Sequence, residues 1–304
     1  MHVAGYGDLM KVAAEFTVPA VDTGIPNPPE YATYMYRHIK FLSSAAAWRG
    51  RDDVIVLYDP IVGGAGTGRV SPAPPLMYNI TNMSHLHGAN IATTYAPLDR
   101  LDQGTTQGAG YEQADYQAFA RYNARLASVL RGARRETAVA VYYPVNMFQA
   151  DYLPRKKHWS QIVPFHQGRQ YAWDRVGETL EKADIDYQIV HPEAVRDAEI
   201  DGDLLKIGTG AYRYLVLPQV EFISRDVLEK IRLWESQGGK AIWVGSVARQ
   251  GIRPEEDAEV ARLAKPYLPA PVEDIAPRIT NPYGEAYDLT FNAVPTEYNV
   301  ATSP

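Results

Sequence analysis

The first 135 residues alternate short apolar runs with longer segments of helical periodicity, which is typical of strand–loop–helix units. The apolar runs predict strands at residues 16–21, 54–57 and 89–96. The periodic segments that follow predict helices at residues 31–48, 76–87 and 112–131, and a glycine stands at or just after the end of each. Three such units in a row predict a parallel sheet.

A second series of apolar runs begins at residue 137 with the sequence TAVAVYY. Further strands are predicted at residues 187–190, 212–217 and 241–244, with helices at 172–183 and 224–237 and a hairpin turn at Asp201-Gly202-Asp203. This order predicts a second, doubly wound α/β domain. We therefore divide the chain into residues 1–134, 135–265 and a Pro-rich remainder, 266–304, which we interpret as a linker and the start of a truncated further segment. The run at 287–291 is strand-like but has no evident partner.

Composition removes several classes of function. The 304 residues carry a net charge of −6 without a basic stripe, so nucleic acid is not expected as a partner. No run approaches the roughly 18 apolar residues of a membrane span, and no signal peptide is recognisable. The chain has no Cys, which excludes disulfides and thiolate chemistry, whereas its 21 Tyr and 5 Trp suit a protein that stacks aromatic rings on sugars.

Several blocks then resemble a known family. GYGDLMKVAAEFTVPAVDTG, KFLSSAAAWRGRDDVIVLYDP, HGANIATTYAP, YNARLASVLRGARRETAVAVYYP and YRYLVLPQVEFISRDVLEKIRLWESQGGKAIWVG occur in this order. Together they resemble the C-terminal half of large glycoside hydrolases of the α-L-rhamnosidase and β-galactosidase type, over roughly residues 1–265. The resemblance implies the end of a (β/α)₈ barrel followed by a flavodoxin-like domain related to class I glutamine amidotransferases.

The length that precedes the second domain is short for such a barrel. A complete (β/α)₈ barrel needs about 250 residues, against about 135 here. The resemblance therefore implies that Met1 lies near the fifth strand and that the general acid/base, at the end of the fourth strand, is missing. We expect the chain alone to be inactive as a glycosidase.

The candidate site residues stand at predicted strand ends. Asp59 follows the run at 54–57, where the resemblance implies a catalytic carboxylate that is more commonly Glu; alternatively, Asp59 before Pro60 initiates a turn. Asp22 closes the preceding strand and could bind substrate or form an Asx turn. His2 and Asp8 resemble ligands for sugar hydroxyls at the end of the fifth strand.

Two tyrosines, Tyr58 and Tyr95, also stand at strand ends, where they could stack on a sugar or pack in the core. His85 and His87 are two residues apart on a predicted helix, which points them in different directions, so we interpret them as helix-end residues and expect no metal. The glycine-rich loop at 63–68 lacks the Lys-Ser/Thr of a phosphate loop, so no cofactor is expected. The lack of Cys excludes amidotransferase chemistry.

The leading hypothesis is a fragment of a glycoside hydrolase that acts on an oligo- or polysaccharide, α-L-rhamnosidase-like ahead of β-galactosidase-like. The first alternative is a non-catalytic carbohydrate-binding or oligomerisation protein of the same architecture, with a possible homo-oligomer formed through the second domain. A flavodoxin-like nucleotide or flavin binder is a further alternative, although no phosphate loop follows the strand at 137–143.

Overall fold

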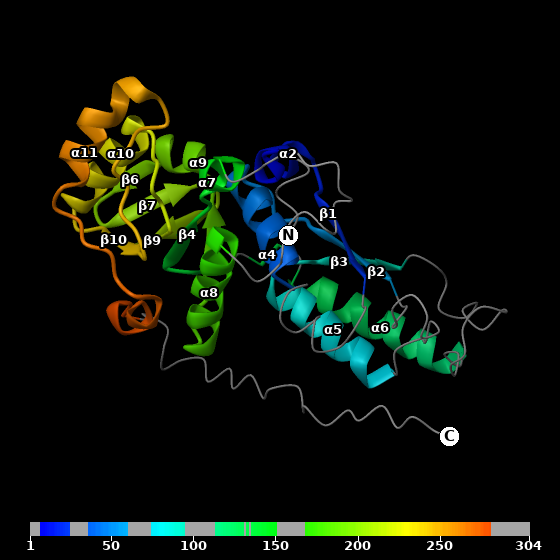
Figure 1. Ribbon diagram of the computed structural model, residues 1–304. Coiled ribbons are helices and arrows are strands. Elements are labelled where there is room, and N and C mark those ends of the chain that lie inside the picture. The colour runs from blue at the N-terminus through cyan, green and yellow to red at the C-terminus, as the bar shows by residue number, and fades with distance from the viewer. Residues whose placement is uncertain are drawn as a thin grey trace. The chain divides into compact units, whose positions relative to one another are not determined.

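The computed structural model describes residues 7–24, 36–59, 74–94, 113–130, 132–133, 135–150 and 168–280 (Figure 1). The contacts divide the chain into two compact units. Among the described residues, the smaller unit contains 18–24, 36–43, 53–59, 74–94, 113–130 and 132–133, and the larger unit contains 7–17, 44–52, 135–150 and 168–280.

The smaller unit contains a parallel three-stranded sheet in the order β1-β2-β3. The strands are β1 (Ala20–Gly24), β2 (Ile55–Asp59) and β3 (Ile91–Thr94). The helices that alternate with them along the chain are α4 (Tyr36–Trp48), α5 (Pro74–Leu86) and α6 (Gln113–Leu130). The parallel strand–helix units predicted from the sequence are therefore confirmed in the described residues.

Helices cover one face of this sheet. Val56 of β2 is fully buried, and Val21 and Ala92, its partners in register, pack in the same apolar cluster. The helices supply Ile39, Met77, Ile80 and Phe119 to that cluster. The residues that alternate with these along the strands point to the opposite face of the sheet and are less buried: Ile55 and Leu57 are half-buried and Ile91 is 36% exposed. The two faces of the sheet thus have different environments.

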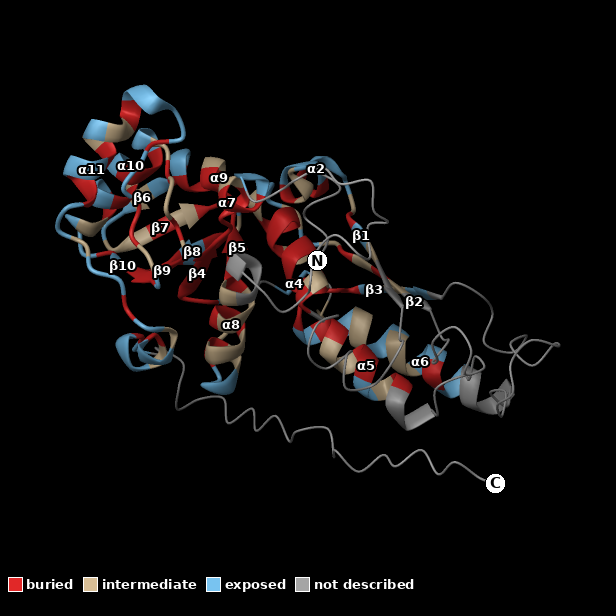
Figure 2. Cartoon of the chain, viewed as in Figure 1, coloured by how far each residue is buried: buried red, intermediate tan, exposed pale blue. Residues whose placement is uncertain are grey.

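The larger unit is built on a parallel four-stranded sheet in the order β10-β9-β4-β5. Its strands are β4 (Val139–Tyr142), β5 (Gln188–Val190), β9 (Tyr214–Pro218) and β10 (Lys240–Val244). Every residue of β4, β5 and β9 is buried, as expected for parallel strands covered on both faces (Figure 2). The runs that predicted these strands are continuous in apolar residues for this reason.

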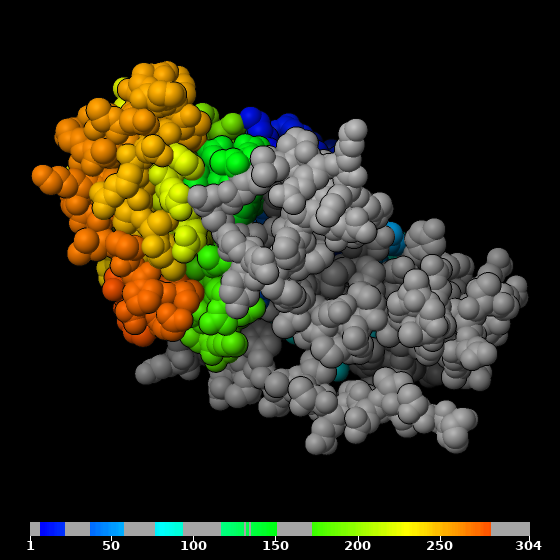
Figure 3. Space-filling model, in the orientation of Figure 1, coloured from blue at the N-terminus to red at the C-terminus, as the bar shows by residue number. Residues whose placement is uncertain are grey.

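Three longer helices accompany this sheet: α8 (Gly168–Lys182), α10 (Arg225–Glu235) and α11 (Asp257–Ala264). Trp234 of α10 and Val260 of α11 are buried in one cluster with Tyr142 and Leu215 of the sheet. The helix α11 is followed by the short 3-10 turns η5 (Val272–Asp274) and η6 (Ala276–Arg278), which lie in the deep orange part of the surface in Figure 3. A third such turn, η4 (Pro254–Glu256), precedes α11.

An antiparallel meander precedes β9: β6 (Glu199–Asp201), β7 (Leu204–Ile207) and β8 (Gly210–Tyr212). The turn at Asp201-Gly202-Asp203 is the predicted hairpin, which is confirmed. The second turn of the meander contains Gly208, with a φ of +56°. A Cβ at Gly208 would lie 1.9 Å from the carbonyl oxygen of Ala47, so this turn requires glycine both for its conformation and for its close approach to α4.

Three short helices were missed by the sequence analysis: α2 (Leu9–Glu15), α7 (Val145–Ala150) and α9 (Pro192–Arg196). The predicted strand at 16–21 is wrong in its start. Phe16 follows the end of α2, and the strand begins at Ala20. The reason is that Met10, Ala13 and Ala14 are buried on one face of a helix, which Asp8 caps.

Some expectations lie outside the described residues, among them the strand-like run at 287–291. The proposed division into residues 1–134 and 135–265 stays a prediction. None of the helices in the described part of the chain is long and apolar enough to cross a membrane.

Candidate functional site

The backbone of the smaller unit places two of the predicted site residues on neighbouring strands. Asp22 of β1 pairs in register with Leu57 of β2, and Gly24 pairs with Asp59, the last residue of β2. Asp59 therefore lies two register positions beyond Asp22, at the carboxyl end of its strand. The side chains of Asp22 and Asp59 lie outside what the structure describes.

Tyr58 is described only by its backbone, which pairs with Thr23 on one side and Thr94 on the other. Tyr95 and His2 lie outside the described residues. The sequence-based grouping of these residues with Asp22 and Asp59 stays a prediction.

Asp8 belongs to the larger unit, where its partners are defined. Its Oδ1 accepts a hydrogen bond from the backbone N–H of Lys11 (3.1 Å), which caps α2, and its Oδ2 lies 2.7 Å from Nε2 of His191. The Nδ1 of His191 accepts a hydrogen bond from the backbone N–H of Glu193 (3.1 Å), so Nε2 carries the ring proton and donates a hydrogen bond to Asp8. The His191 ring is 3% exposed and stacks on Trp48, with 5.0 Å between ring centroids and an interplanar angle of 13°.

The electrostatics of this cluster are consistent with a structural role. Burial by itself raises the pKa of Asp8, but the hydrogen bond and attraction of His191, together with Lys11, outweigh it and hold the pKa below its ordinary value of 3.8. Both ring nitrogens of His191 are engaged. This arrangement joins α2 to the start of α9.

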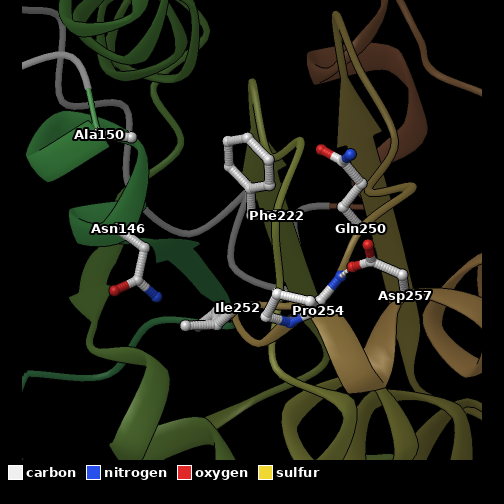
Figure 4. Close-up of a pocket in the computed structure, with 8 residues that line it drawn as sticks. Asn146, Ala150, Phe222, Gln250, Ile252, Pro254 and Asp257 are labelled. Carbon is white, nitrogen blue, oxygen red and sulfur yellow. Dashed lines mark hydrogen bonds between the residues drawn. The ribbon is translucent and has the colours of Figure 1, made fainter.

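A pocket lies in the larger unit, next to the carboxyl ends of β4, β9 and β10 (Figure 4). Its volume is about 330 Å³, at the lower end of the range for small-molecule sites. In open parallel sheets, ligands bind beyond the carboxyl ends of the strands, where the strand order reverses. Here the chain passes from β4 outward to β5 and returns to β9 on the other side of β4, so the reversal lies between β4 and β9. The lining residues are Asn146, Ala150, Phe222, Gln250, Gly251, Ile252, Pro254 and Asp257.

The wall of the pocket at 250–257 is held by specific bonds. The backbone N–H of Gly251 donates to Oδ1 of Asp257 (2.8 Å), and the buried Glu256 accepts from Nε of Arg253 (2.9 Å) and from the backbone N–H of Arg225 (3.3 Å). A Cβ at Gly251 would lie 2.4 Å from Cβ of Glu256, so only glycine fits. Burial raises the pKa of Glu256, but these bonds outweigh it and the net pKa is lowered, so the carboxylate stays ionised at neutral pH.

Histidines do not form a metal site in the described part of the chain. His85 lies in the last turn of α5, where its Nδ1 bonds to the carbonyl oxygen of Thr81 (2.9 Å), and burial lowers its pKa. This agrees with the interpretation of His85 as a helix-end residue. Among the residues that the structure describes, no group of three or more His, Asp or Glu side chains could hold a metal ion.

Sequence reasoning missed the pocket of the larger unit. Pro144, Pro218 and Gly245-Ser246 follow the predicted strands of the second domain directly and carry no Cys nucleophile, and no residue further along these loops was predicted to line a pocket. The lining side chains begin four to six residues beyond the ends of β4, β9 and β10, and an extension of the same strand-end rule to the following loops would have included Asn146 and Phe222.

Comparison with known proteins places the fold. No protein-family model matches the sequence, and no curated protein matches it. Among solved structures, a catalytic mutant of a GH42 β-galactosidase from G. stearothermophilus matches with a TM-score of 0.55 and 14% identity, over 77% of this chain and 34% of that one. The chain is similar in fold to a GH42 β-galactosidase.

Two further β-galactosidases give similar matches. The enzyme from Bacillus circulans sp. alkalophilus matches with a TM-score of 0.56 and 16% identity over 78% of this chain, and the cold-adapted enzyme from a Rahnella species with 0.50 and 16% over 79%. The chain spans about a third of the length of these β-galactosidases (34% and 35%). These three matches support the parallel α/β architecture. Because each extends over more than three quarters of the chain, each includes residues of both units.

Proposed function

We propose that this chain is part of a glycoside hydrolase in which the smaller unit supplies strands of a (β/α)₈ barrel and the larger unit is a flavodoxin-like domain. The observation that carries the proposal is the similarity in fold to β-galactosidases over 77–79% of the chain. The strand order β5-β4-β9-β10, which in order along the chain is 2-1-3-4, matches the first four positions of the flavodoxin-like order 2-1-3-4-5 and supports the second part.

The uneven burial of the β1-β2-β3 sheet supports the barrel. In a (β/α)₈ barrel, helices cover the outer face of every strand, and side chains of the inner face pack together in layers. Val56 and its neighbours face the helices here, whereas Ile55, Leu57 and Ile91 have the opposite phase and are less buried. Such a face fits the inside of a barrel whose other strands belong to the rest of a longer protein.

The register then favours particular site residues. Asp59 and Leu57 are two residues apart on β2, and Leu57 pairs with Asp22, so the positions of Asp22 and Asp59 share the phase of the less buried face. The position of Tyr58 shares the phase of Val56, which packs against the helices. Barrel enzymes carry their catalytic groups at the carboxyl ends of the strands, so we assign Asp59 as the catalytic carboxylate and Asp22 as a substrate ligand, ahead of Tyr58.

A single carboxylate cannot complete glycoside hydrolysis. The reaction needs a general acid that protonates the leaving oxygen and a second carboxylate that acts as nucleophile or base on the other side of the bond. We propose that the second group lies on another strand of the complete barrel. Within this proposal, a β-galactosidase is favoured over an α-L-rhamnosidase because the three solved structures compared above are β-galactosidases.

The test uses the product of the longest open reading frame that contains this chain. It is assayed with 4-nitrophenyl β-D-galactopyranoside and with the corresponding α-L-rhamnopyranoside, beside the 304-residue chain. We expect turnover of the galactoside by the longer protein and none by the 304-residue chain. Turnover of the rhamnoside alone would correct the substrate class, and turnover of neither by a folded longer protein would favour the non-catalytic alternative.

A further inference from the structure

We propose that the pocket of the larger unit is a separate binding site for one neutral sugar ring. This site is built by the carboxyl-edge loops of the four-stranded sheet and does not depend on the catalytic assignment of Asp59. Its position is the one where open parallel sheets bind ligands.

The first argument is the combination of an aromatic wall with free amides. Phe222 is half-buried and its ring stands between Asn146 and Ala150 of α7 and Gln250 on the opposite wall (Figure 4). Among the described residues, the side-chain amides of Asn146 and Gln250 make no hydrogen bond. An aromatic face packs on the C–H face of a sugar ring, and each amide offers one acceptor and two donors to hydroxyl groups.

The second argument is rigidity. The backbone at Phe222 pairs in parallel with that at Gln250, with the N–H of Ile223 on the carbonyl of Gln250 (3.2 Å) and the N–H of Arg249 on the carbonyl of Glu221 (3.1 Å). These bonds fix the relative positions of the two backbone segments that carry the aromatic ring and one amide before any ligand arrives. A site that is already ordered loses less entropy on binding.

The third argument is charge. The only ionisable side chain among the eight lining residues is Asp257, whose Oδ1 accepts from Gly251, so Oδ2 can accept from a hydroxyl group. The nearby Arg253 is paired with Glu256 and does not line the pocket. A pocket with one carboxylate and no cation disfavours phosphates and nucleotides, whereas its volume of about 330 Å³ suits a single ring.

The experiment records the side-chain amide signals of Asn146 and Gln250 by ¹⁵N NMR on the full 304-residue chain, assigned with Asn146→Ala and Gln250→Ala. The probes are D-galactose, L-rhamnose and inorganic phosphate. We expect saturable shifts of both signals with at least one sugar and none with phosphate. We further expect Phe222→Leu, which keeps apolar volume but removes the ring, to weaken the sugar about fivefold or more, and Gln250→Ala to weaken it about threefold.

The matched control is Gln237→Ala, because Gln237 is an exposed glutamine just beyond α10 and does not line the pocket. It should leave the affinity unchanged. The proposal is overturned if neither sugar shifts the two amide signals at concentrations up to about 0.1 M. It is equally overturned if phosphate shifts them instead, or if Phe222→Leu and Gln250→Ala, both folded, bind the sugar as the parent chain does.

Discussion

His191 donates a hydrogen bond from Nε2 to Oδ2 of Asp8 over 2.7 Å, although 183 residues separate the two along the chain. Asp8 simultaneously caps α2, and His191 simultaneously caps α9. One pair of side chains therefore begins two helices and joins them. This relationship makes Asp8 a structural residue of the larger unit, whichever sugar contacts the complete protein makes.

Loss of this bond should destabilise the larger unit. Asp8→Ala removes both a helix cap and a charged acceptor from a histidine that is 3% exposed, so we expect the free energy of unfolding to fall by about 2 kcal/mol in urea denaturation. Glu15→Ala is the control, because it removes an exposed ion pair with Arg49 and should cost less than about 1 kcal/mol. Equal effects of the two variants would contradict the role of Asp8.

The same pair predicts a pH dependence. The pKa of Asp8 is lower in the folded chain than its ordinary value of 3.8, so the folded state binds this proton less readily than the unfolded state does. The contribution of Asp8 to stability is therefore fully present above pH 3.8 and is lost as the pH falls through the lowered folded value. Urea denaturation at a series of pH values should show the difference between the parent chain and Asp8→Ala constant near neutrality and shrinking below pH 3.8. A difference that grows on acidification would contradict this sign.

Two glycines of the meander offer a matched comparison. Gly202 and Gly208 have φ values of +58° and +56°, but a Cβ at Gly202 would meet no atom within 4 Å, whereas one at Gly208 would meet the carbonyl oxygen of Ala47 at 1.9 Å. Gly202→Ala should cost about 1 kcal/mol for conformation alone. Gly208→Ala should cost about 3 kcal/mol or more, because the backbone must also move. Thermal or urea denaturation of both variants measures the difference, and equal costs would show that the packing against α4 is not tight.

Much of the fold could be predicted because buried parallel strands are recognisable from short, continuous apolar runs in the sequence. The runs at 54–57 and 137–143 are continuous in apolar residues because parallel strands are extensively buried. Glycines just after several predicted helices indicate where those helices end. The hairpin at Gly202 was predictable for the same local reason. The helix α2 was not, because its capping residue Asp8 is bonded to His191, which no local pattern connects to Asp8.

The two candidate sites also differ in how far the sequence could predict them. Asp22 and Asp59 could be assigned to adjacent strands from the order of the units, and the register that sets their phase is a property of the folded sheet. The pocket of the larger unit could not be assigned from single positions. Asn146, Phe222 and Gln250 are ordinary residues in sequence and become a site only because three strand ends bring their loops together.

The central claim, that the carboxyl end of β2 carries a catalytic carboxylate of a glycoside hydrolase, is tested most directly by the kcat of the longer protein with Asp59→Asn. The account predicts hydrolysis of 4-nitrophenyl β-D-galactopyranoside by the parent and a fall in kcat of about three orders of magnitude or more in the variant. The thermal midpoint should change little, and Asp274→Asn, at an exposed site of the larger unit, should leave kcat unchanged. A folded Asp59→Asn variant that retains the parent kcat would contradict the claim.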